Sequence, residues 1–486
     1  MKKHISKFIM MIPIIPVLVI AVFLMVIISG APPHHYPPDS DEINGPESSE
    51  GAENGTGNSE DIIENPFDEP DSEDPHISEN PFDPDNIIDP PEPDEPDEQD
   101  DSAEPPQLTP PEPTPPPEEE IFSISQLNTG LTRQLDRIAE QYNVVAASLV
   151  VYDGNLRDYY TYEYGYRTLS ARRPVDVDTK FRVASLSKLV AVMCAMSLVE
   201  AGTLDLDADI SDYLGYSVRN PGFPDAKITT RMLIQHTSSL YDSNQYVNAG
   251  NRNSVSTAKR LLDTGVCYED WAPGTEFEYS NFGYSILGLV CENISGKRFN
   301  TLARDVIFLP LGIDAAFLPS TLIERTNIAA IYGSEHYQRR SIQAQLTSGD
   351  SSAGGSDHNQ VPGNLMINII DYTKILTALG NGGILDDVRI LSEESVREIH
   401  NTNSETEWYI QGLSTRYQND PEIPLLSSFW HTGSAWGVFA QFNYYIGNGI
   451  NRGVVIITTG ASTDRLENGM VEVCTDMSVL ALRLLD

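Results

Sequence analysis

The chain has 486 residues, of which 40% are hydrophobic, and its formal net charge is −40 at pH 7. Its length allows one large domain or two or three ordinary ones, and so acidic a balance argues against a nucleic-acid partner. The charge is unevenly spread, because residues 31–120 hold 30 of the 71 acidic residues, 22 of the 33 prolines and no Lys or Arg. That segment carries −30 of the net charge, and the three lysines before it leave −13 for residues 121–486.

An apolar segment lies near the N-terminus. Residues 8–28 form an unbroken apolar run of 21 residues, which follows Lys2, Lys3 and Lys7. A helix of that length spans about 31 Å, the hydrocarbon thickness of a bilayer, whereas the apolar core of a cleaved signal peptide usually has only about 7–15 residues. Residues 1–30 are therefore predicted to be a cytoplasmic stub and a transmembrane anchor. The lysines favour an N-terminus inside the cell, so we expect a single-pass protein of the cell membrane with its later residues outside.

Residues 31–120 are predicted to be a disordered linker, because their Pro, Asp, Glu and Ser content leaves too few apolar side chains to bury a core. The sequence Glu-Asn-Pro-Phe-Asp occurs twice, at residues 64–68 and 79–83. Two copies are consistent with a docking motif or, more simply, with low-complexity drift. A flexible spacer of this length would average about 50–60 Å from end to end.

Residues 121–486 show the patterns of a folded domain. Apolar residues at helical spacing predict a helix over residues 124–141, and two segments over 144–152 and 159–166, joined by the hairpin turn signal Asp-Gly-Asn at 153–155, predict strands. A helix follows from Ser185 to about residue 202, and helices and loops continue to about residue 400. Strands return at 437–446 and 453–459, and a helix over 466–484 closes the chain. Strands at both ends with helices between them predict an α+β fold, an antiparallel sheet with a helical insertion.

The four cysteines give no sign of a metal or redox site. Cys194, Cys291 and Cys474 fall in apolar helical segments, where a buried free thiol is expected. Cys267 completes the set, and no C-x-x-C spacing occurs. We therefore expect neither a metal nor a cofactor.

The strongest chemical signal is the spacing of Ser185 and Lys188 at the head of an apolar helical run. Residues three apart at a helix start lie on one face, and the exposed backbone N–H groups there favour a developing negative charge. A serine hydroxyl is a weak nucleophile near neutral pH and needs a neighbouring base. The S-x-x-K pattern arises often by chance, so its value depends on companions elsewhere in the chain.

Two companions follow in order, Tyr279-Ser280-Asn281 and His431-Thr432-Gly433. Together the three boxes resemble the signature of the penicillin-recognising serine hydrolases, in the form typical of the branch of class C β-lactamases, D,D-peptidases and esterases. The stretch at residues 233–240 is similar to that branch's L-L-x-H-T-S-G-L, with Ser239 where the family has Gly. The resemblance covers residues 122–486. We interpret His236 in this stretch as structural.

This resemblance implies acyl transfer through a serine ester. Ser185 would attack a carbonyl carbon, Lys188 would take its proton, and Tyr279 would shuttle protons. Asn281 would bond Lys188 and the substrate amide. Substrate would also meet the third box and the residue after it, and the backbone N–H groups of Ser185 and Ser434 would form the oxyanion hole. The third box itself consists of His431, Thr432 and Gly433. Its glycine would let the strand approach the substrate closely.

The third box begins with His431 instead of Lys, so the charge of the His431 side chain is expected to change near pH ~6.5.

We interpret the chain as an extracellular, membrane-anchored serine hydrolase that acts on D-alanyl peptides or esters of the cell envelope and is acylated by β-lactams. A class C-like β-lactamase and a non-catalytic penicillin- or peptide-binding receptor remain alternatives. Residues 333–364 show no readable pattern, and the sequence does not indicate an oligomeric state.

Overall fold

The structure is a computed structural model. It describes residues 129–483 except 155, 157, 251–253, 350–354, 402–410, 413–414, 420–426, 448 and 467–468. The predicted anchor at residues 1–30 and linker at residues 31–120 lie outside this range. Within the range, no helix has both the length and the apolar character needed to cross a bilayer.

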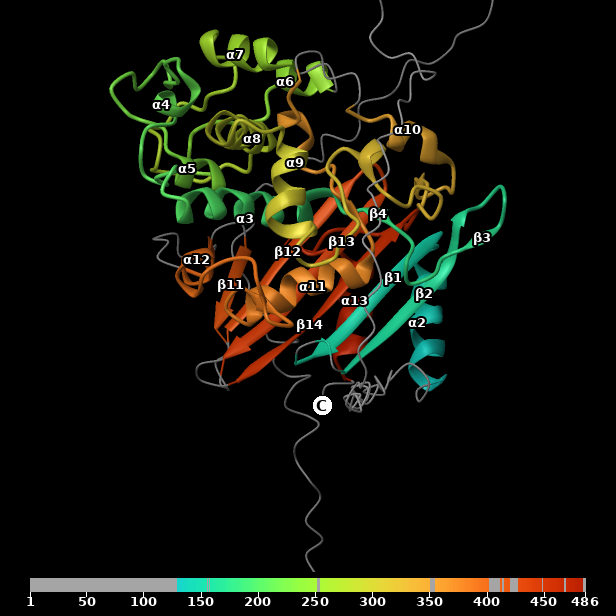
Figure 1. Ribbon diagram of the computed structural model, residues 1–486. Helices are drawn as coiled ribbons and strands as arrows, with labels where there is room; N and C mark the ends of the chain where they lie inside the picture. Colours follow the sequence, from blue (N-terminus) through green and yellow to red (C-terminus); the bar gives the residue numbers. More distant parts are fainter. Residues whose placement is uncertain are drawn as a thin grey trace, which may run out of the picture. The chain divides into compact units, whose positions relative to one another are not determined.

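An eight-stranded antiparallel sheet forms the centre of the described residues (Figure 1). Its strand order is β10-β11-β12-β13-β14-β1-β2-β3. The N-terminal strand β1 pairs with β14 near the C-terminus, with Val150 opposite Val455, so the predicted sheet built from both ends of the chain is confirmed. The strands are β1 (Ala146–Asp153), β2 (Asp158–Thr168), β3 (Arg173–Pro174), β10 (Gln411–Gly412), β11 (Thr415–Asn419), β12 (Ser427–Ala435), β13 (Val438–Gly447) and β14 (Ile450–Thr459).

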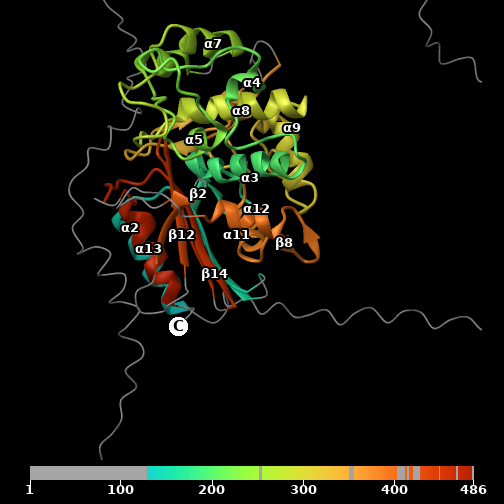
Figure 2. The same ribbon diagram turned by 90° about the vertical axis from the view of Figure 1, so that its left-hand side faces the viewer.

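Both faces of the sheet are covered by helices (Figure 2). Along β14, Val454 and Ile456 join one apolar cluster and Val455 and Ile457 join the other. Successive side chains of a strand point to opposite faces, so a strand buried on both sides needs a continuous apolar run. Helices α2 (Thr129–Gln141) and α13 (Glu472–Leu482) cover one face, and α11 (Ile369–Gly380) covers the other.

The residues between β3 and β10 form the predicted helical insertion, which rises from one end of the sheet (Figure 1). Its helices are η3 (Ala184–Leu186), α3 (Ser187–Glu200), α4 (Ile210–Leu214), α5 (Thr230–Ile234), α6 (Asn244–Ala249), α7 (Val255–Asp263), α8 (Asn281–Ser295), α9 (Phe299–Ala303), η5 (Arg304–Phe308), η6 (Pro319–Thr321), α10 (Ile342–Leu346), η7 (His358–Gln360), α11 and α12 (Glu393–Ile399). Short strand pairs lie among them: β4 (Phe181–Arg182) with β7 (Met366–Ile367), β5 (Ile331–Tyr332) with β6 (Gln338–Arg340), and β8 (Ile384–Leu385) with β9 (Val388–Arg389).

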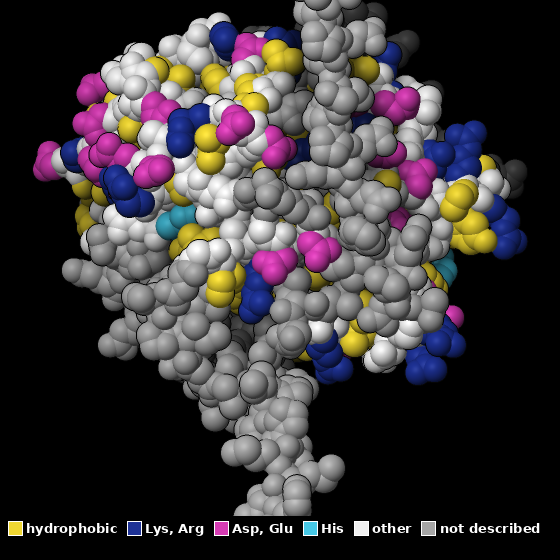
Figure 3. Space-filling model, turned by 60° about the horizontal axis from the view of Figure 1, so that its bottom comes forward, with side chains coloured by type: hydrophobic (Ala, Val, Ile, Leu, Met, Phe, Trp, Pro, Cys, Tyr) yellow, Lys and Arg dark blue, Asp and Glu magenta, His cyan; other side chains and the backbone are white. Residues whose placement is uncertain are grey.

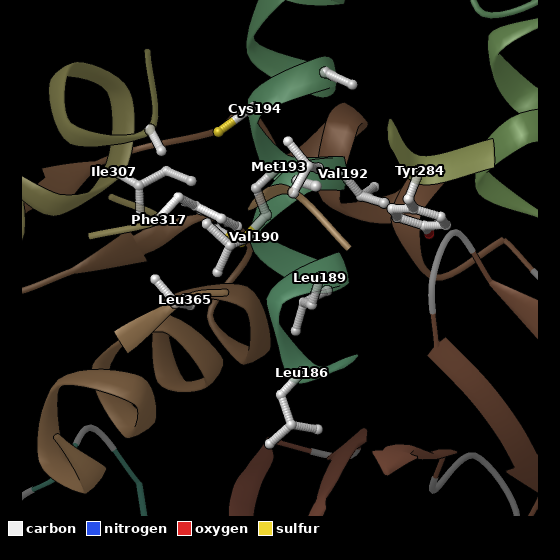
Figure 4. Packing of buried hydrophobic residues seen from close by; sticks show 14 of the residues in the cluster. Leu186, Leu189, Val190, Val192, Met193, Cys194, Tyr284, Ile307, Phe317 and Leu365 are labelled. Carbon is white, nitrogen blue, oxygen red and sulfur yellow. The ribbon is translucent and has the colours of Figure 1, made fainter. Parts of the chain in front are cut away.

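Helix α3 passes through the core, which explains its apolar sequence. Its side chains point in several directions (Figure 4): Val192 faces Tyr284 on α8, while Val190 lies on the side of Phe317. A helix buried on all sides is apolar all round. The four cysteines, including Cys194 on this helix, are buried and free.

Two predicted boundaries were wrong. The last helix begins at Glu472 instead of residue 466, because Arg465 bridges to Val471 and Gly469 has a φ of +81°, which turns the chain before the helix starts. Ser185 lies in the 3₁₀ turn η3 that precedes α3, not in the α-helix itself.

Charged side chains of both signs are interspersed on the face drawn in Figure 3. The acidic excess of the whole sequence is therefore not seen there as a continuous acidic surface. This distribution agrees with the modest net charge calculated for residues 121–486.

Candidate active site

Ser185 sits on a short turn that several contacts hold in place. Strand β4 pairs with β7, and the Val183 amide donates to the Leu365 carbonyl at 3.0 Å just before the turn. Ser187 is fully buried, donates from Oγ to the Ala184 carbonyl at 2.6 Å and accepts from the Leu365 amide at 3.1 Å. Ala184 has a φ of +47°, a conformation that costs energy for a side chain other than glycine. The turn is therefore braced against residue 365 on both sides of the serine.

Lys188 lies directly beneath the serine hydroxyl. Its Nζ is 3.1 Å from Ser185 Oγ, 2.8 Å from Asn281 Oδ1 and 2.8 Å from the Pro362 carbonyl oxygen. The lysine side chain is completely buried, whereas Ser185 is partly exposed. Burial lowers the pKa of Lys188 to about 7, and the negative charge of Asp242 opposes this shift. The lysine can therefore lose and regain a proton near neutral pH beside a hydroxyl that a ligand can reach.

The second box brings Tyr279 to the same place. Lys188 Nζ lies 4.8 Å from the centroid of the Tyr279 ring. The tyrosine ring also contacts His236, with ring centroids 4.3 Å apart. The next residue, Ser280, caps α8 by accepting a hydrogen bond from the Gly283 amide at 2.9 Å. Because α8 begins at Asn281, the cap fixes where the asparagine leaves the backbone and faces Lys188.

Asp242 holds this second box together, and the sequence analysis missed it. One carboxylate oxygen accepts from the Phe282 amide at 2.8 Å and from Ser280 Oγ at 3.3 Å, and the other accepts from Asn281 Nδ2 at 2.8 Å. A carboxylate can only accept hydrogen bonds, so it orients the asparagine with Oδ1 toward Lys188. The residue stands four positions after Ser238 in a loop, where no periodic pattern marks it.

The third box lies on β12, which packs against the serine turn. A Cβ on Gly433 would lie 2.5 Å from the Val183 carbonyl oxygen and 3.3 Å from the Ser185 amide nitrogen. Only a glycine lets the strand approach so closely. His431 is nearly buried, and its ring centroid is 6.5 Å from that of Tyr279. Thr432 and Ser434 flank the glycine on the same strand, and Ser434 is partly exposed.

His236, in the loop after α5, has the structural role expected of it. Its Nδ1 accepts a hydrogen bond from the Ser280 amide at 3.0 Å, so this nitrogen carries no proton and the imidazole supports the second box. Ser239 has a φ of +62° and accepts from Asn220 Nδ2 at 3.0 Å. Ser239 thus adopts the left-handed conformation that glycine favours, and the turn keeps its shape.

Three predicted boxes, far apart in sequence, thus meet around Ser185 and the buried lysine beside it. The sequence analysis did not find three further residues: Pro362 contacts the lysine through its backbone carbonyl, Ser187 braces the turn through its hydroxyl, and Asp242 orients the asparagine through its carboxylate. A hydroxyl in the S-x-x-K box could have pointed to Ser187, and a carboxylate soon after the H-T-S stretch to Asp242. Neither signal is specific without coordinates.

Comparison with known proteins gives relatives of the same kind. Penicillin-binding protein 4* of Bacillus subtilis (strain 168) is 29% identical over 160 residues, which are 32% of this chain and 34% of that protein. D-alanyl-D-alanine-carboxypeptidase/endopeptidase AmpH of Escherichia coli (strain K12) is 31% identical over 192 residues, 39% of this chain and 49% of that protein. The chain thus spans a third to a half of the length of these curated relatives.

Solved structures and a family model extend the similarity over the folded part. A class C beta lactamase from Rhodobacter sphaeroides has the same fold, with a TM-score of 0.57 and 19% identity over 73% of this chain and 99% of that one. A family model described as Beta-lactamase matches residues 131–473, which is well over half of the sequence. This chain therefore belongs to the Beta-lactamase family, whose members are serine hydrolases.

Proposed function

We propose that this protein hydrolyses D-alanyl peptides or esters of the cell envelope through an acyl-enzyme on Ser185, as a D,D-carboxypeptidase or esterase. The observation that carries the proposal is the position of the buried Lys188 Nζ, 3.1 Å from the partly exposed Ser185 Oγ. The name of the relative AmpH, a D-alanyl-D-alanine carboxypeptidase and endopeptidase, supports the substrate class.

In the first step, Lys188 takes the proton of the Ser185 hydroxyl as the oxygen attacks the substrate carbonyl. Burial brings the pKa of Lys188 to about 7, so a large share of the protein carries the neutral amine near neutral pH. The negative charge that develops on the carbonyl oxygen is held by the backbone N–H groups of Ser185 and Ser434. Each such donor contributes about 3–4 kcal/mol to stabilising a transition state.

In the second step, the bond to the leaving group breaks and the proton passes to the departing nitrogen or oxygen. Tyr279, whose ring centroid lies 4.8 Å from Lys188 Nζ, is the residue that we propose conducts that proton through its hydroxyl. Water then attacks the Ser185 ester by the reverse route, and the carboxylic acid leaves. Asn281, which accepts from Lys188, would also bond the substrate amide.

The edge of β12 gives the substrate a place to bind. Strand β11 pairs with residues 427–430 of β12 and, among the described residues, no strand pairs with the same edge from His431 to Ala435. An extended peptide can add to such an edge through backbone hydrogen bonds. In this proposal the reacting carbonyl lies near Ser434 and a leaving-group carboxylate lies near His431 and Thr432.

The proposed location is the outer face of the cell membrane. It rests on the apolar run at residues 8–28, the lysines before it and the acidic spacer at residues 31–120. A tethered catalytic domain of this kind would act on envelope polymers within reach of the spacer. The β-lactam drugs, which mimic D-alanyl peptides, would acylate the same serine.

The test is mass spectrometry of the full chain after incubation with a fluorescent penicillin, with Ser185→Ala as the control. We expect one adduct on Ser185 that the variant lacks, together with hydrolysis of D-alanyl esters. A long-lived adduct supports a peptidase or esterase, whereas an adduct that clears within seconds while penicillin is consumed identifies a β-lactamase. If wild type and variant are equally inert toward penicillins, esters and peptides, the proposed enzymatic function is refuted.

A further inference from the structure

Two arginines contact one tryptophan at the end of β12. The guanidinium carbon of Arg182 lies 3.8 Å from the centroid of the Trp436 ring, and that of Arg340 lies 4.4 Å from it. Trp436 occupies the turn between β12 and β13 and has a φ of +54°. We name Arg182, Trp436 and Arg340 the Arg–Trp–Arg cluster.

The cluster brings two positive charges together. Arg182 is nearly buried and donates from Nε to the Gly363 carbonyl at 2.8 Å. Arg340 is half-buried, and no ion pair to it is recorded within the residues that the structure describes. Burial lowers the pKa of Arg340. Partial desolvation of a cation beside a second cation is costly without an anion nearby, although the ring face offsets part of that cost.

The cluster adjoins the proposed reacting centre. Trp436 follows Ser434 by two residues, in the turn just past the end of β12, whereas His431 precedes Ser434 by three residues on that strand. Arg182 stands three residues before Ser185, and its partner Gly363 follows Pro362, whose carbonyl accepts from Lys188. Along the chain, Ser434 therefore stands between His431 and Trp436. If His431 meets the leaving group, the cluster meets the acyl part.

We propose that the Arg–Trp–Arg cluster binds a carboxylate on the acyl part of the substrate, so that the preferred acyl donors are anionic peptides or esters. This inference rests on the proposed function, because Ser434 marks where the carbonyl lies. Arg340 makes the main contact, since its planar group can present two parallel N–H donors to one carboxylate. Trp436 offers an apolar face to the carbons next to that carboxylate. Arg182, which is hydrogen-bonded to the Gly363 carbonyl, adds a second positive charge next to the tryptophan ring.

The experiment compares two thioester substrates that differ in one group. Both carry a D-alanyl acyl centre and the same leaving group, but one is capped with a succinyl group and the other with the uncharged, nearly isosteric succinamoyl group. We expect the full-length wild type to prefer the succinyl substrate in kcat/KM. Arg340→Gln should lower kcat/KM for the succinyl substrate by about 10–100-fold, as for loss of a charged hydrogen-bonded pair, and leave the succinamoyl substrate within about 2-fold.

The neighbouring Arg339 provides a matched control, because it is exposed and stacks on Tyr337 instead of Trp436. Arg339→Gln should leave both substrates within about 2-fold. Arg340→Lys, which keeps the charge but loses the planar fork, should recover only part of the preference. Equal loss on both substrates, or no preference in the wild type, overturns the cluster as a carboxylate site.

Acylation of Ser185 by a fluorescent penicillin with an uncharged side chain is measured in parallel. Normal acylation of wild type and Arg340→Gln shows that the protein is folded and that the catalytic centre works, so a missing succinyl preference then counts against the cluster alone. A wild type that is neither acylated nor active on either thioester overturns the proposed function itself, and the cluster inference fails with it.

Discussion

Asp242 fixes the orientation of Asn281, because its carboxylate accepts from Asn281 Nδ2 at 2.8 Å while Asn281 Oδ1 faces Lys188 Nζ at 2.8 Å. The same carboxylate accepts from the Phe282 amide at the start of α8. Asp242 thereby links a loop, a helix N-terminus and the lysine under the serine. It is a positioning residue, since it acts on the lysine through the asparagine and through its charge.

Asp242→Asn should lower kcat/KM for a D-alanyl ester by about 10–100-fold. The variant has one side-chain oxygen, so either Phe282 or Asn281 loses its acceptor, and an unpaired buried polar group costs about 1–3 kcal/mol. Removal of the charge also lowers the pKa of Lys188 further, because Asp242 raises it. The acid limb of the pH profile should therefore move to lower pH, which a purely structural defect would not produce.

The charged and titratable groups around this pair define what the profile can report. Around Asp242 lie Glu278, Tyr246 and Cys267, and the rings of Tyr279 and Tyr284 face Lys188. Asp263→Asn is the matched control, since Asp263 is exposed and pairs only with Lys259 four residues away among the described ion pairs. An unmoved acid limb in Asp242→Asn would contradict the electrostatic link.

Lys188 should set the acid limb of the wild-type profile at about pH 7, the value to which burial lowers its pKa. In the proposed mechanism the unprotonated amine accepts the serine proton, so kcat/KM should rise as pH rises through that value. Lys188→Arg keeps a cation that does not deprotonate in this range and should lose about 10²–10⁴-fold in kcat/KM. Ester hydrolysis measured from pH 5 to pH 9 tests both statements, and a rate independent of pH across that range would exclude the lysine as the base.

The sequence was sufficient where a local pattern decides the structure. The continuous apolar runs of α3, β1 and β14 follow from burial on several sides, and those elements were predicted within a few residues. The start of α13 was missed because Leu466, Met470 and Val471 continue a helical spacing, whereas Gly469 turns the chain and the Glu472 amide donates to the Asp464 carbonyl. Tertiary contacts, which no local pattern records, decide that boundary.

The same distinction holds for the site. The three boxes carry residue types at fixed short spacings, so their identity could be predicted, although their roles remain proposals. Asp242 and Arg340 could not be predicted, because each stands in a segment of short elements and owes its position to contacts with distant residues. Arg340 meets Trp436, 96 positions later in the chain, and no pattern in residues 333–364 indicates that contact.

Gly433→Ala should slow acylation by about 10²–10³-fold, comparable to the loss of one oxyanion donor. The new methyl group would lie 2.5 Å from the Val183 carbonyl oxygen, so β12 must move away from the serine turn and carry the Ser434 amide with it. The rate of labelling by a fluorescent penicillin measures this effect. Gly222→Ala is the control, since a Cβ there meets only Asn220 Oδ1 at 3.4 Å; equal rates in both variants would show that the close approach is not required.

Ser239 allows the strain of its left-handed backbone to be measured separately from its hydrogen bond. Ser239→Gly and Ser239→Ala both lose the bond from Asn220 Nδ2, worth about 1 kcal/mol, but only the glycine variant also relieves the strain at φ +62°, about 1–2 kcal/mol. Thermal unfolding should therefore place the alanine variant below both the wild type and the glycine variant. A glycine variant less stable than the alanine variant would show that the backbone here is unstrained.

His431 should make substrate binding depend on pH. Its Nδ1 lies 2.6 Å from the Thr432 carbonyl oxygen, and a carbonyl only accepts, so Nδ1 keeps its proton and Nε2 is the nitrogen that gains or loses one. A protonated Nε2 attracts a leaving-group carboxylate, and an unprotonated one does not donate to it. KM for an anionic substrate should therefore rise between about pH 5.5 and about pH 8.

His431→Lys keeps its charge over this range and should give a nearly constant KM. A substrate without the carboxylate is the control, because any change of its KM with pH reports groups other than His431, such as Lys188, and only the additional change seen with the anionic substrate is assigned to His431. A wild-type KM for the anionic substrate that stays constant would mean that His431 does not contact the carboxylate.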